Sequence, residues 1–248
     1  MVSASLLIIG DEILSGRTQD KNLAYIAMWL NEAGIQLAEV RVVQDIRDDI
    51  VSAVNAMRAR FDYVFTTGGI GPTHDDITAE SIAAAFELPL TTHPEAYRIL
   101  TEYYGASDFT DARQRMSKTP EGAALIDNPV SIAPGFQVEN VFVMAGVPKI
   151  MQAMLEALRP SLKTGRKIWS QALTIHAPES KMASRLGDIQ EEVAGVSLGS
   201  YPFFREGKIG TQIVVRSADK AAITAAMKLL EAYCSAQDIL REERADLI

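Results

Sequence analysis

The sequence predicts an α/β protein in which a three-layer α/β/α domain with a mostly parallel sheet precedes a small α+β domain. Two observations lead to this prediction. Up to about residue 162, short runs rich in β-branched residues alternate with segments of helical periodicity, the pattern of βα units around a parallel sheet. Beyond the basic stretch "RPSLKTGRKIW", the order changes to β-α-β-β-α. We therefore expect domains at residues 1–164 and 165–248.

The first domain is expected to contain four helices and four strands. The segment 22–34 repeats apolar residues at helical spacing and ends on Gly34, a natural helix stop, and the segment 46–61 has the same periodicity. A third helix should begin with Thr78 as its N-cap, and a fourth should cover residues 94–104. The predicted strands cover residues 5–9, 37–43, 63–67 and 141–144.

The second domain is expected to contain a strand, a helix, a pair of strands and a final helix. These elements should cover residues 168–175, 180–193, a hairpin that turns at Glu206 and Gly207, and 219–234. The glycines of "EGKIG" favour a hairpin turn, because such turns need residues with positive φ.

Composition and charge narrow the classes of function. The 248 residues include 48% hydrophobic and 23% charged residues, as in ordinary globular proteins, and the net charge of -8 disfavours binding to nucleic acid. No run approaches the roughly 18 apolar residues of a membrane span. The N-terminus lacks the basic leader of a signal peptide, and the single Cys234 excludes an internal disulfide. We expect a cytoplasmic protein without a membrane partner.

Unusual residues follow each of the four predicted strands of the first domain. "GDEILSG" follows the first strand, Asp45 the second, "GGIGPTHDDIT" the third and "AGVP" the fourth. Because ligands of parallel α/β proteins bind at the carboxyl ends of the strands, these four loops should meet at one rim. A glycine-rich turn or a pair of aspartates alone is often only a tight turn or a helix start. Because unusual residues follow all four strands, we favour a ligand site at this rim.

The residues at this rim indicate a phosphate-type ligand. Gly68, Gly69 and Gly71 permit close approach of the backbone, and their amides suit a phosphate or diphosphate. Carboxylates beside them would repel a bare phosphate, so Asp45, Asp75 and Asp76, with Glu12, suggest a divalent cation, most simply Mg²⁺, between protein and phosphate.

Two further features have an ordinary and a functional interpretation. His74 lies within the third loop and is either an exposed loop residue or a group that contacts phosphate. Arg113, Arg115 and Lys118 form either a solvated helix face or a basic arm that reaches over a diphosphate.

The ordered motifs "GDEILSG", "TTGGIGPTHDDIT", "PEGAALIDNPVSIAPGF" and "VMAGVP", with Asn22 and Asp45, resemble the molybdopterin-binding domain family that includes MoaB and MogA. The similarity covers roughly residues 3 to 160 and is greatest to the branch of the CinA N-terminal region. It implies a three-layer α/β/α fold with catalytic Asp45 and Asp76 and a metal near Asp75 and Asp76. The implied ligand-binding residues are Gly10, Asp11, Glu12, Asn22, Thr67, Gly68, Gly69, Gly71, Thr73, Thr78, Gly146 and Pro148.

One residue of the third loop departs from the adenylyltransferases of this family. Those enzymes have arginine where this chain has Asp75, and the aspartate of their motif falls on Asp76. The departure favours metal-dependent hydrolysis of a nucleotide diphosphate such as ADP-ribose or FAD. The alternatives are a non-catalytic molybdopterin- or nucleotide-binding protein and a molybdopterin adenylyltransferase.

The second domain resembles the KH-like module that follows this domain in CinA. Its G-x-x-G spacing at Gly207 and Gly210 lies in a hairpin, whereas RNA-binding KH domains carry it between two helices, so we expect no nucleic-acid partner. By resemblance, the protein is expected to form a homo-oligomer that binds a small nucleotide diphosphate or pterin.

Overall fold

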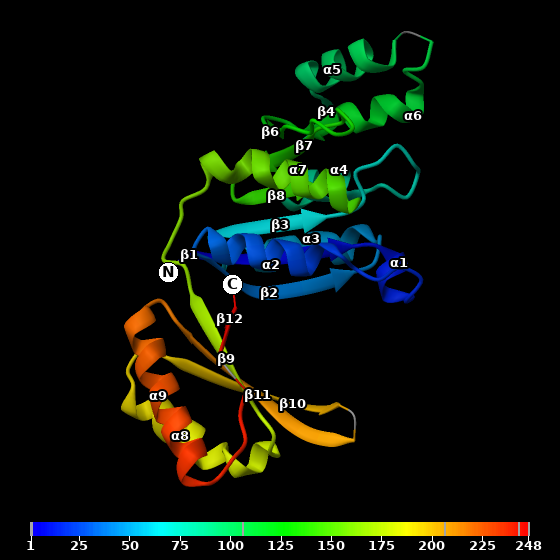
Figure 1. Cartoon of the computed structure of the whole chain (residues 1–248). Helices are drawn as coiled ribbons and strands as arrows, with labels where there is room; N and C mark the ends of the chain where they lie inside the picture. Colours follow the sequence, from blue (N-terminus) through cyan, green and yellow to red (C-terminus); the bar gives the residue numbers. More distant parts are fainter. Residues whose placement is uncertain (1, 106, 206, 243, 248) are drawn as a thin grey trace. The chain divides into compact units, whose positions relative to one another are not determined.

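The computed structural model describes residues 2–105, 107–205, 207–242 and 244–247 (Figure 1). The chain forms two compact units, Met1–Gly165 and Arg166–Ile248, and each has its own hydrophobic core. Within the described residues, no helix combines the length and the apolar character needed to span a membrane.

The first unit is built on a six-stranded sheet with the order β2-β1-β3-β8-β7-β6. The pairs β2–β1, β1–β3 and β3–β8 are parallel, whereas β8–β7 and β7–β6 are antiparallel, so the predicted mostly parallel sheet is confirmed. The sequence analysis missed β6 and β7, which have only three and four residues. The strands are β1 (Val2–Ile9), β2 (Ile35–Val43), β3 (Tyr63–Thr67), β6 (Ala124–Ile126), β7 (Gly135–Val138) and β8 (Val141–Met144).

Helices cover both faces of this sheet, which confirms the predicted three layers (Figure 1). Helices α2 (Asn22–Glu32) and α7 (Pro148–Leu158) share one core with the alternate residues Leu6 and Ile8 of β1. On the other face, α3 (Arg47–Arg58) and α4 (Thr78–Ala85) share a second core with Leu7 and Ile9. Successive residues of β1 therefore face opposite layers, as the pleat of a strand requires.

The connections of the sheet place a crevice at the carboxyl ends of β1 and β3. Strand β1 lies between β2 and β3. The chain therefore runs from β1 to its neighbour on one side, β2, and then to its neighbour on the other side, β3. The loop after β1 leads to α2 on one face, and the loop after β3 leads to α4 on the opposite face. Loops that diverge in this way leave the space in which open α/β sheets bind their ligands.

The start of α4 differs from the prediction that Thr78 is its N-cap. The N-cap is Ile77, and Thr78 is the first helical residue. The hydroxyl of Thr78 instead donates to the Gly68 carbonyl (3.0 Å), and its amide donates to the Gly69 carbonyl (3.0 Å). The side chain that would cap the helix is thus used to hold the glycine turn.

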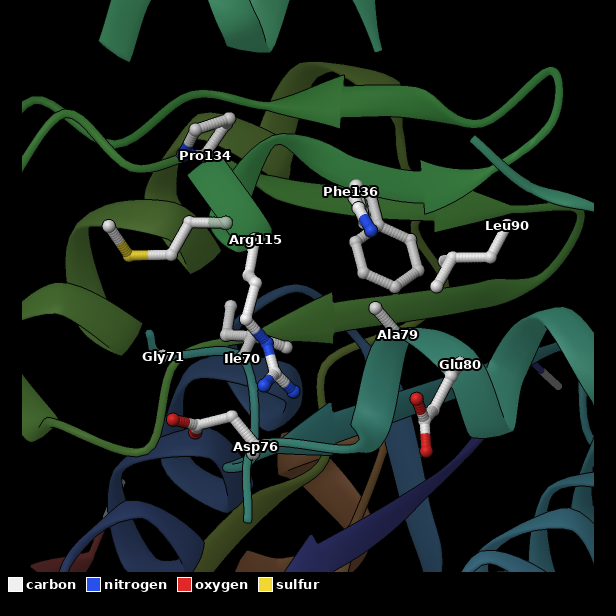
Figure 2. Close-up of a pocket in the computed structure, with 12 residues that line it drawn as sticks. Ile70, Gly71, Asp76, Ala79, Glu80, Leu90, Arg115, Pro134 and Phe136 are labelled. Atoms are coloured by element: carbon white, nitrogen blue, oxygen red, sulfur yellow. The ribbon is translucent and has the colours of Figure 1, made fainter. Parts of the chain in front are cut away.

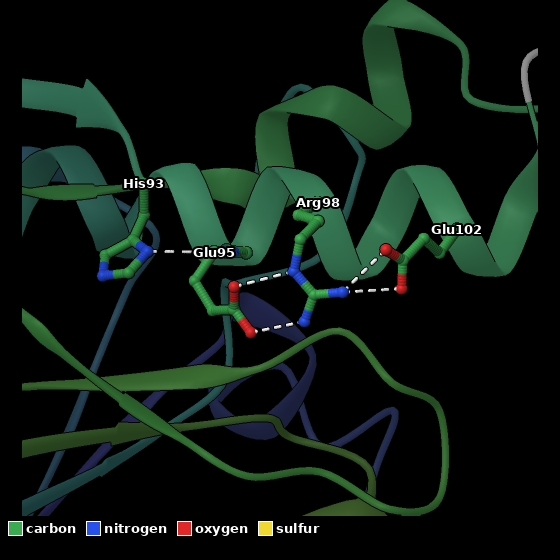
Figure 3. A network of polar contacts seen from close by, with 5 residues as sticks. His93, Glu95, Arg98 and Glu102 are labelled. Carbon is green, nitrogen blue, oxygen red and sulfur yellow. Dashed lines mark hydrogen bonds and ion pairs between the residues drawn. The ribbon is translucent and has the colours of Figure 1, made fainter.

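A smaller part of the first unit lies beyond the sheet. Helix α5 has His93 as its N-cap, whose Nδ1 accepts from the Ala96 amide (3.4 Å). On the exposed face of α5, Arg98 bonds both Glu95 and Glu102 (Figure 3). These carboxylates raise the pKa of Arg98 above its usual range. The remaining elements are α1 (Asp11–Leu14), β4 (Leu90–Thr92), α5 (Pro94–Tyr104), α6 (Asp111–Gln114), η1 (Arg115–Ser117), β5 (Lys118–Pro120) and η2 (Arg159–Ser161).

The second unit has the predicted β-α-β-β-α order and one further strand, β12. Its sheet has the order β10-β11-β9-β12 and carries a core shared with the two long helices. The predicted hairpin joins β10 and β11, and Gly207 has the positive φ (76°) expected of its turn, while Glu206 lies outside the described residues. The elements are β9 (Trp169–Ile175), η3 (Glu179–Lys181), α8 (Ala183–Glu192), β10 (Ser197–Arg205), β11 (Lys208–Ser217), α9 (Lys220–Ala236) and β12 (Ala245–Leu247).

Candidate functional site

The glycine turn after β3 packs directly against the end of β1. Gly68 has φ 106° and Gly69 has φ 66°, a region that other residues rarely adopt. A Cβ on Gly68 would lie 2.2 Å from the Ile9 carbonyl oxygen, and one on Gly69 would lie 2.2 Å from Oγ1 of Thr78. Both positions therefore require glycine for space as well as for conformation.

The amides of this turn differ in their availability to a ligand. The Gly68 amide donates to the Met144 carbonyl (3.2 Å), so it cannot serve the phosphate cradle that the sequence suggested. Within the described structure, the amides of Gly69, Ile70 and Gly71 have no hydrogen-bond acceptor. These three successive N–H groups are the donors that an anion would use.

Around the turn, the loops after β1, β2, β3 and β8 line one cavity of about 560 Å³. The four loops that the sequence assigned to one rim are thus found together. Asp45 and Asp76, from different loops, line the same cavity. The predicted site residues in its wall are Gly10, Glu12, Asp45, Gly68, Gly69, Gly71, Asp75, Asp76, Gly146 and Pro148.

Three predicted site residues do not line this cavity but form hydrogen bonds with residues that do. The Asp11 amide donates to Oδ2 of Asp45 (2.9 Å), and the Asp45 amide donates to Oδ1 of Asp11 (3.4 Å). The amide of Thr73 donates to Oδ2 of Asp76 (2.8 Å), which also accepts a bond from the Thr73 hydroxyl. The third is Thr78, which fixes the glycine turn.

The carboxylates of the cavity repel one another. Burial raises the pKa of Asp45, and the charges of Asp11, Glu12 and Asp75 raise it further, while the hydrogen bond from the Asp11 amide opposes them. Asp75 is exposed, and hydrogen bonding within its own loop lowers its pKa. The fold therefore gathers negative charge at this rim, and Asp45 has no basic partner among the residues that the structure describes.

This charge suits a hard divalent cation that is shared with a ligand. Among the described residues, no group of three or more His, Cys, Asp or Glu side chains is arranged to hold a metal ion by itself. Mg²⁺, however, commonly keeps several waters and is bound by one or two carboxylates and by substrate phosphates. The oxygen donors present fit that mode, and the assignment of Asp75 and Asp76 as metal ligands stays a prediction.

A second cavity of about 340 Å³ lies on the other side of the glycine turn (Figure 2). It shares Gly69, Gly71 and Asp76 with the first cavity. Figure 2 shows the guanidinium group of Arg115 pointing into it on the side of Asp76 and Glu80. Lys118 also lines it, and neither cation has an ion-pair partner among the described residues.

The predicted basic arm is therefore only partly right. Arg113 lines neither of these two cavities, and its guanidinium lies over the ring of Tyr104 (4.2 Å) and donates to the Asp108 carbonyl (2.6 Å). His74 is 95% exposed and lies 4.0 Å from Asp75, so it has the position of an ordinary loop residue.

A third cavity of about 280 Å³ adjoins the first on the side of α2. Asn22 and Thr67, both predicted ligand-binding residues, line it together with Glu12, Gly68 and Pro148. Asn22 donates from Nδ2 to the Gly146 carbonyl (2.8 Å), which ties the start of α2 to the loop after β8.

The loop between β6 and β7 belongs to the motif "PEGAALIDNPVSIAPGF", but the sequence analysis named no site residue in it. This loop completes the first cavity with Asn128, Ser131 and Ala133. Buried Asn128 organises this loop, since its Nδ2 donates to the Ala133 carbonyl (2.7 Å) and its Oδ1 accepts from the Val130 amide (3.1 Å). The asparagine before Pro129 in "IDNPVSIAPG" is the signal that could have identified this loop as ordered.

The topology and the rim define a parallel α/β domain with its ligand cavities at the carboxyl ends of the strands. Residues 5–164 match the family model described as probable molybdopterin binding domain. A protein of Archaeoglobus fulgidus is 33% identical over 226 residues, which are 91% of this chain and 95% of that protein. The chain therefore belongs to this family, as the motifs predicted.

CinA-like proteins are among the relatives. A CinA-like protein of Desulfosudis oleivorans is 36% identical over 211 residues, and the match covers 79% of this chain but only 51% of that protein. The crystal structure of CinA from Thermoplasma acidophilum is 37% identical with a TM-score of 0.61, and covers 64% of this chain and 96% of that one. The predicted similarity to the CinA branch is confirmed.

The second unit matches a different family model. Residues 167–243 fit the model described as FAD synthase, middle domain. The second unit is thus similar to the middle domain of FAD synthase.

Proposed function

We propose that the protein is a metal-dependent hydrolase of nucleotide diphosphates such as ADP-ribose or FAD. One observation carries the proposal: the free amides of Gly69, Ile70 and Gly71 and the carboxylates of Asp45 and Asp76 belong to one cavity. A diphosphate needs the amides for its oxygens, whereas the carboxylates suit it only when a cation is shared between them. The match of the second unit to an FAD synthase domain agrees with a ligand of this class.

The reaction breaks the bond between one phosphorus atom and the oxygen that bridges the two phosphates. The amides of the glycine turn bind and orient the diphosphate, and a water molecule attacks one phosphorus atom. Asp45, whose raised pKa favours proton uptake, accepts a proton from that water. With ADP-ribose and water, the products are AMP and ribose 5-phosphate.

Two cations of the second cavity are placed to stabilise the leaving phosphate. Arg115 and Lys118 have no carboxylate partner among the described residues, and they adjoin Gly71 and Asp76 in the wall. Their charges oppose the negative charge that develops when the bond breaks. A bound divalent cation such as Mg²⁺ would neutralise phosphate oxygens and polarise the phosphorus atom.

The test is the release of AMP. Purified protein is incubated with ADP-ribose or FAD and MgCl₂, and nucleotides are separated by chromatography. We expect AMP from the wild-type protein, and Asp45→Asn should lower the rate by about 10²–10⁴-fold, as loss of a general base does. Asp188→Asn, an exposed change in α8, is the matched control and should keep the rate. Absence of AMP across a panel of diphosphates and metals contradicts the proposal.

The second candidate function is ligand binding without turnover. It is supported by Oδ2 of Asp76, which already accepts two hydrogen bonds from Thr73. A carboxylate with these bonds stabilises its own loop in addition to any contact with a ligand. Under this alternative, calorimetry shows binding of a pterin or nucleotide by wild-type protein, and no product forms. A molybdopterin adenylyltransferase, the third alternative, would instead release pyrophosphate from ATP when molybdopterin is present.

Two expectations accompany the proposal. A homo-oligomer is tested by light scattering on the purified protein. A cytoplasmic location stays a prediction of the sequence and is tested by cell fractionation.

A further inference from the structure

The third cavity contains two buried oxygen atoms without partners. Asn22 is 4% exposed and Thr67 is 1% exposed, and both line this cavity of about 280 Å³. Within the described part of the chain, neither Oδ1 of Asn22 nor Oγ1 of Thr67 has a hydrogen-bond partner. A buried polar atom without a partner costs about 1–3 kcal/mol, so two such atoms beside one cavity need an explanation.

The orientation of the Asn22 amide is fixed by its neighbour. The carbonyl oxygen of Gly146 can only accept, so the nitrogen of Asn22 faces it at 2.8 Å. The oxygen Oδ1 is consequently left as an acceptor and can be satisfied only by a group that donates a hydrogen bond. The hydroxyl of Thr67 can donate or accept.

The rest of the wall combines charged, polar and apolar side chains. Glu12 and Asp20 add carboxylates, which would repel an anion, and Oδ1 of Asp20 is held by the Leu23 amide (2.8 Å). Thr18, Gln19 and Lys21 add further polar side chains, and the apolar surface comes from Ile8, Ile9, Ile13 and Pro148. The buried acceptor of Asn22 and the hydroxyl of Thr67, beside these apolar side chains, suit an uncharged group with hydroxyl or amino donors.

The third cavity is continuous with the first. Both are lined by Ile9, Glu12, Gly68, Gly146 and Pro148. A ligand whose phosphates lie against the glycine turn can therefore extend its uncharged end past Gly68 toward Asn22.

We propose that the third cavity is the subsite for the uncharged end of the ligand, where Asn22 and Thr67 recognise hydroxyl or amino groups of a sugar or base. The inference rests on the proposed function for the identity of the ligand. It goes beyond that function, because it assigns the half of the ligand that does not carry phosphate to particular residues.

Thr66 and Thr67 form a matched pair for the test. Both threonines are buried, and Oγ1 of each lacks a partner. Thr67 pairs with Ile8, which belongs to the core under α2 and α7, whereas Thr66 pairs with Leu7 in the core under α3 and α4. Because neighbours across a sheet point to the same face, the Thr66 hydroxyl points away from the third cavity.

The experiment compares Thr67→Val with Thr66→Val, which remove the same hydroxyl from opposite faces of one strand. Calorimetry measures the dissociation constants of ADP-ribose, AMP, ribose 5-phosphate and inorganic pyrophosphate with Mg²⁺ present. Thr67→Val should raise the Kd of ADP-ribose about 2- to 12-fold, which corresponds to one lost hydrogen bond. Thr66→Val should leave this Kd unchanged, and neither variant should change the Kd of pyrophosphate.

The fragments identify the group that is recognised. A weaker Kd for AMP alone shows that the nucleoside end occupies the subsite, and a weaker Kd for ribose 5-phosphate alone shows that the free ribose does. Equal effects of the two variants on ADP-ribose overturn the inference, as does an equal loss of pyrophosphate binding in Thr67→Val.

The two proposals fail differently. If Thr67→Val selectively weakens ADP-ribose binding but wild-type protein releases no AMP, the subsite stands and hydrolysis is wrong. If wild-type protein releases AMP and the two variants behave alike, hydrolysis stands and the subsite is wrong. A wild-type protein that binds none of the organic ligands overturns both.

Discussion

Asp45 illustrates a conflict between stability and function at a single residue. Its pKa in the folded protein is raised above the ordinary value of 3.8, so ionisation weakens the folded state. This penalty is absent below pH 3.8, grows as the pH rises through the folded-state pKa and is complete above it. A residue kept at such a cost to the fold is a candidate for chemistry rather than for packing.

The first prediction concerns the stability of an Asp45 variant. Asp45→Asn removes the half-buried charge but keeps an oxygen that can accept from the Asp11 amide. Its Tm should therefore exceed that of the wild-type protein at pH 7, and the gain should shrink as the pH is lowered toward 4. Calorimetric melting across this range checks both parts. A Tm at pH 7 that is equal to or below the wild-type value contradicts this account of Asp45.

The second prediction separates two neighbouring arginines. Arg115 lines the second cavity without an ion-pair partner among the described residues, whereas Arg113 is engaged with Tyr104 and Asp108. Arg115→Ala should weaken pyrophosphate binding by about tenfold or more, because hydrogen bonds to charged groups contribute about 1.5–3 kcal/mol. Arg113→Ala, the control, should bind pyrophosphate as the wild-type protein does. Calorimetry at two salt concentrations also shows whether the loss is electrostatic; equal affinities in both variants would exclude a role for Arg115.

At the scale of elements, the turn between β3 and α4 joins the fold to the site. Its glycines lie against Ile9 of β1, its carbonyls accept from Thr78 of α4, and three of its amides are left for a ligand. The close contacts that leave no space for side chains in this turn thus also fix the positions of its three amides.

The third prediction tests this turn with two glycines of positive φ. Gly68→Ala must displace the end of β1, because its Cβ would lie 2.2 Å from the Ile9 carbonyl oxygen. Gly122 has φ 77° and nothing within 4 Å of its Cβ position, so Gly122→Ala should cost only about 1–2 kcal/mol of backbone strain. Gly68→Ala should cost several kcal/mol more and abolish diphosphate binding. Urea unfolding and calorimetry measure both effects, and similar unfolding free energies of the two variants would contradict the packing argument.

The elements also show what a sequence can predict. Long apolar runs identified β1, β2, β3 and β8, and parallel pairing then placed the loops that follow them at one edge. Strands β6 and β7 were missed, because three or four residues carry too little periodicity. The helix start at Thr78 was wrong by one residue, since the use of its hydroxyl depends on Gly68, which is ten positions away. Local signals cannot reveal such tertiary contacts.

At the scale of the whole molecule, the three cavities belong to one unit. The walls of all three cavities come from residues 8–150, within Met1–Gly165. The second unit has a separate core that includes Leu173, Met182 and Leu230. The first unit therefore carries the candidate site. The match of the second unit to an FAD synthase domain covers residues 167–243 and includes no residue of that site.

The last prediction is that the first unit folds and binds ligand alone. A chain of residues 1–165 keeps the cores on both faces of the sheet and every residue that lines the three cavities. At this length a domain buries about 70% of the surface of its unfolded chain, which is sufficient for independent folding. Its unfolding should be cooperative, and its Kd for pyrophosphate with Mg²⁺ should lie within about twofold of the full-length value. A folded fragment that has lost pyrophosphate binding would show that residues 166–248 contribute to the site.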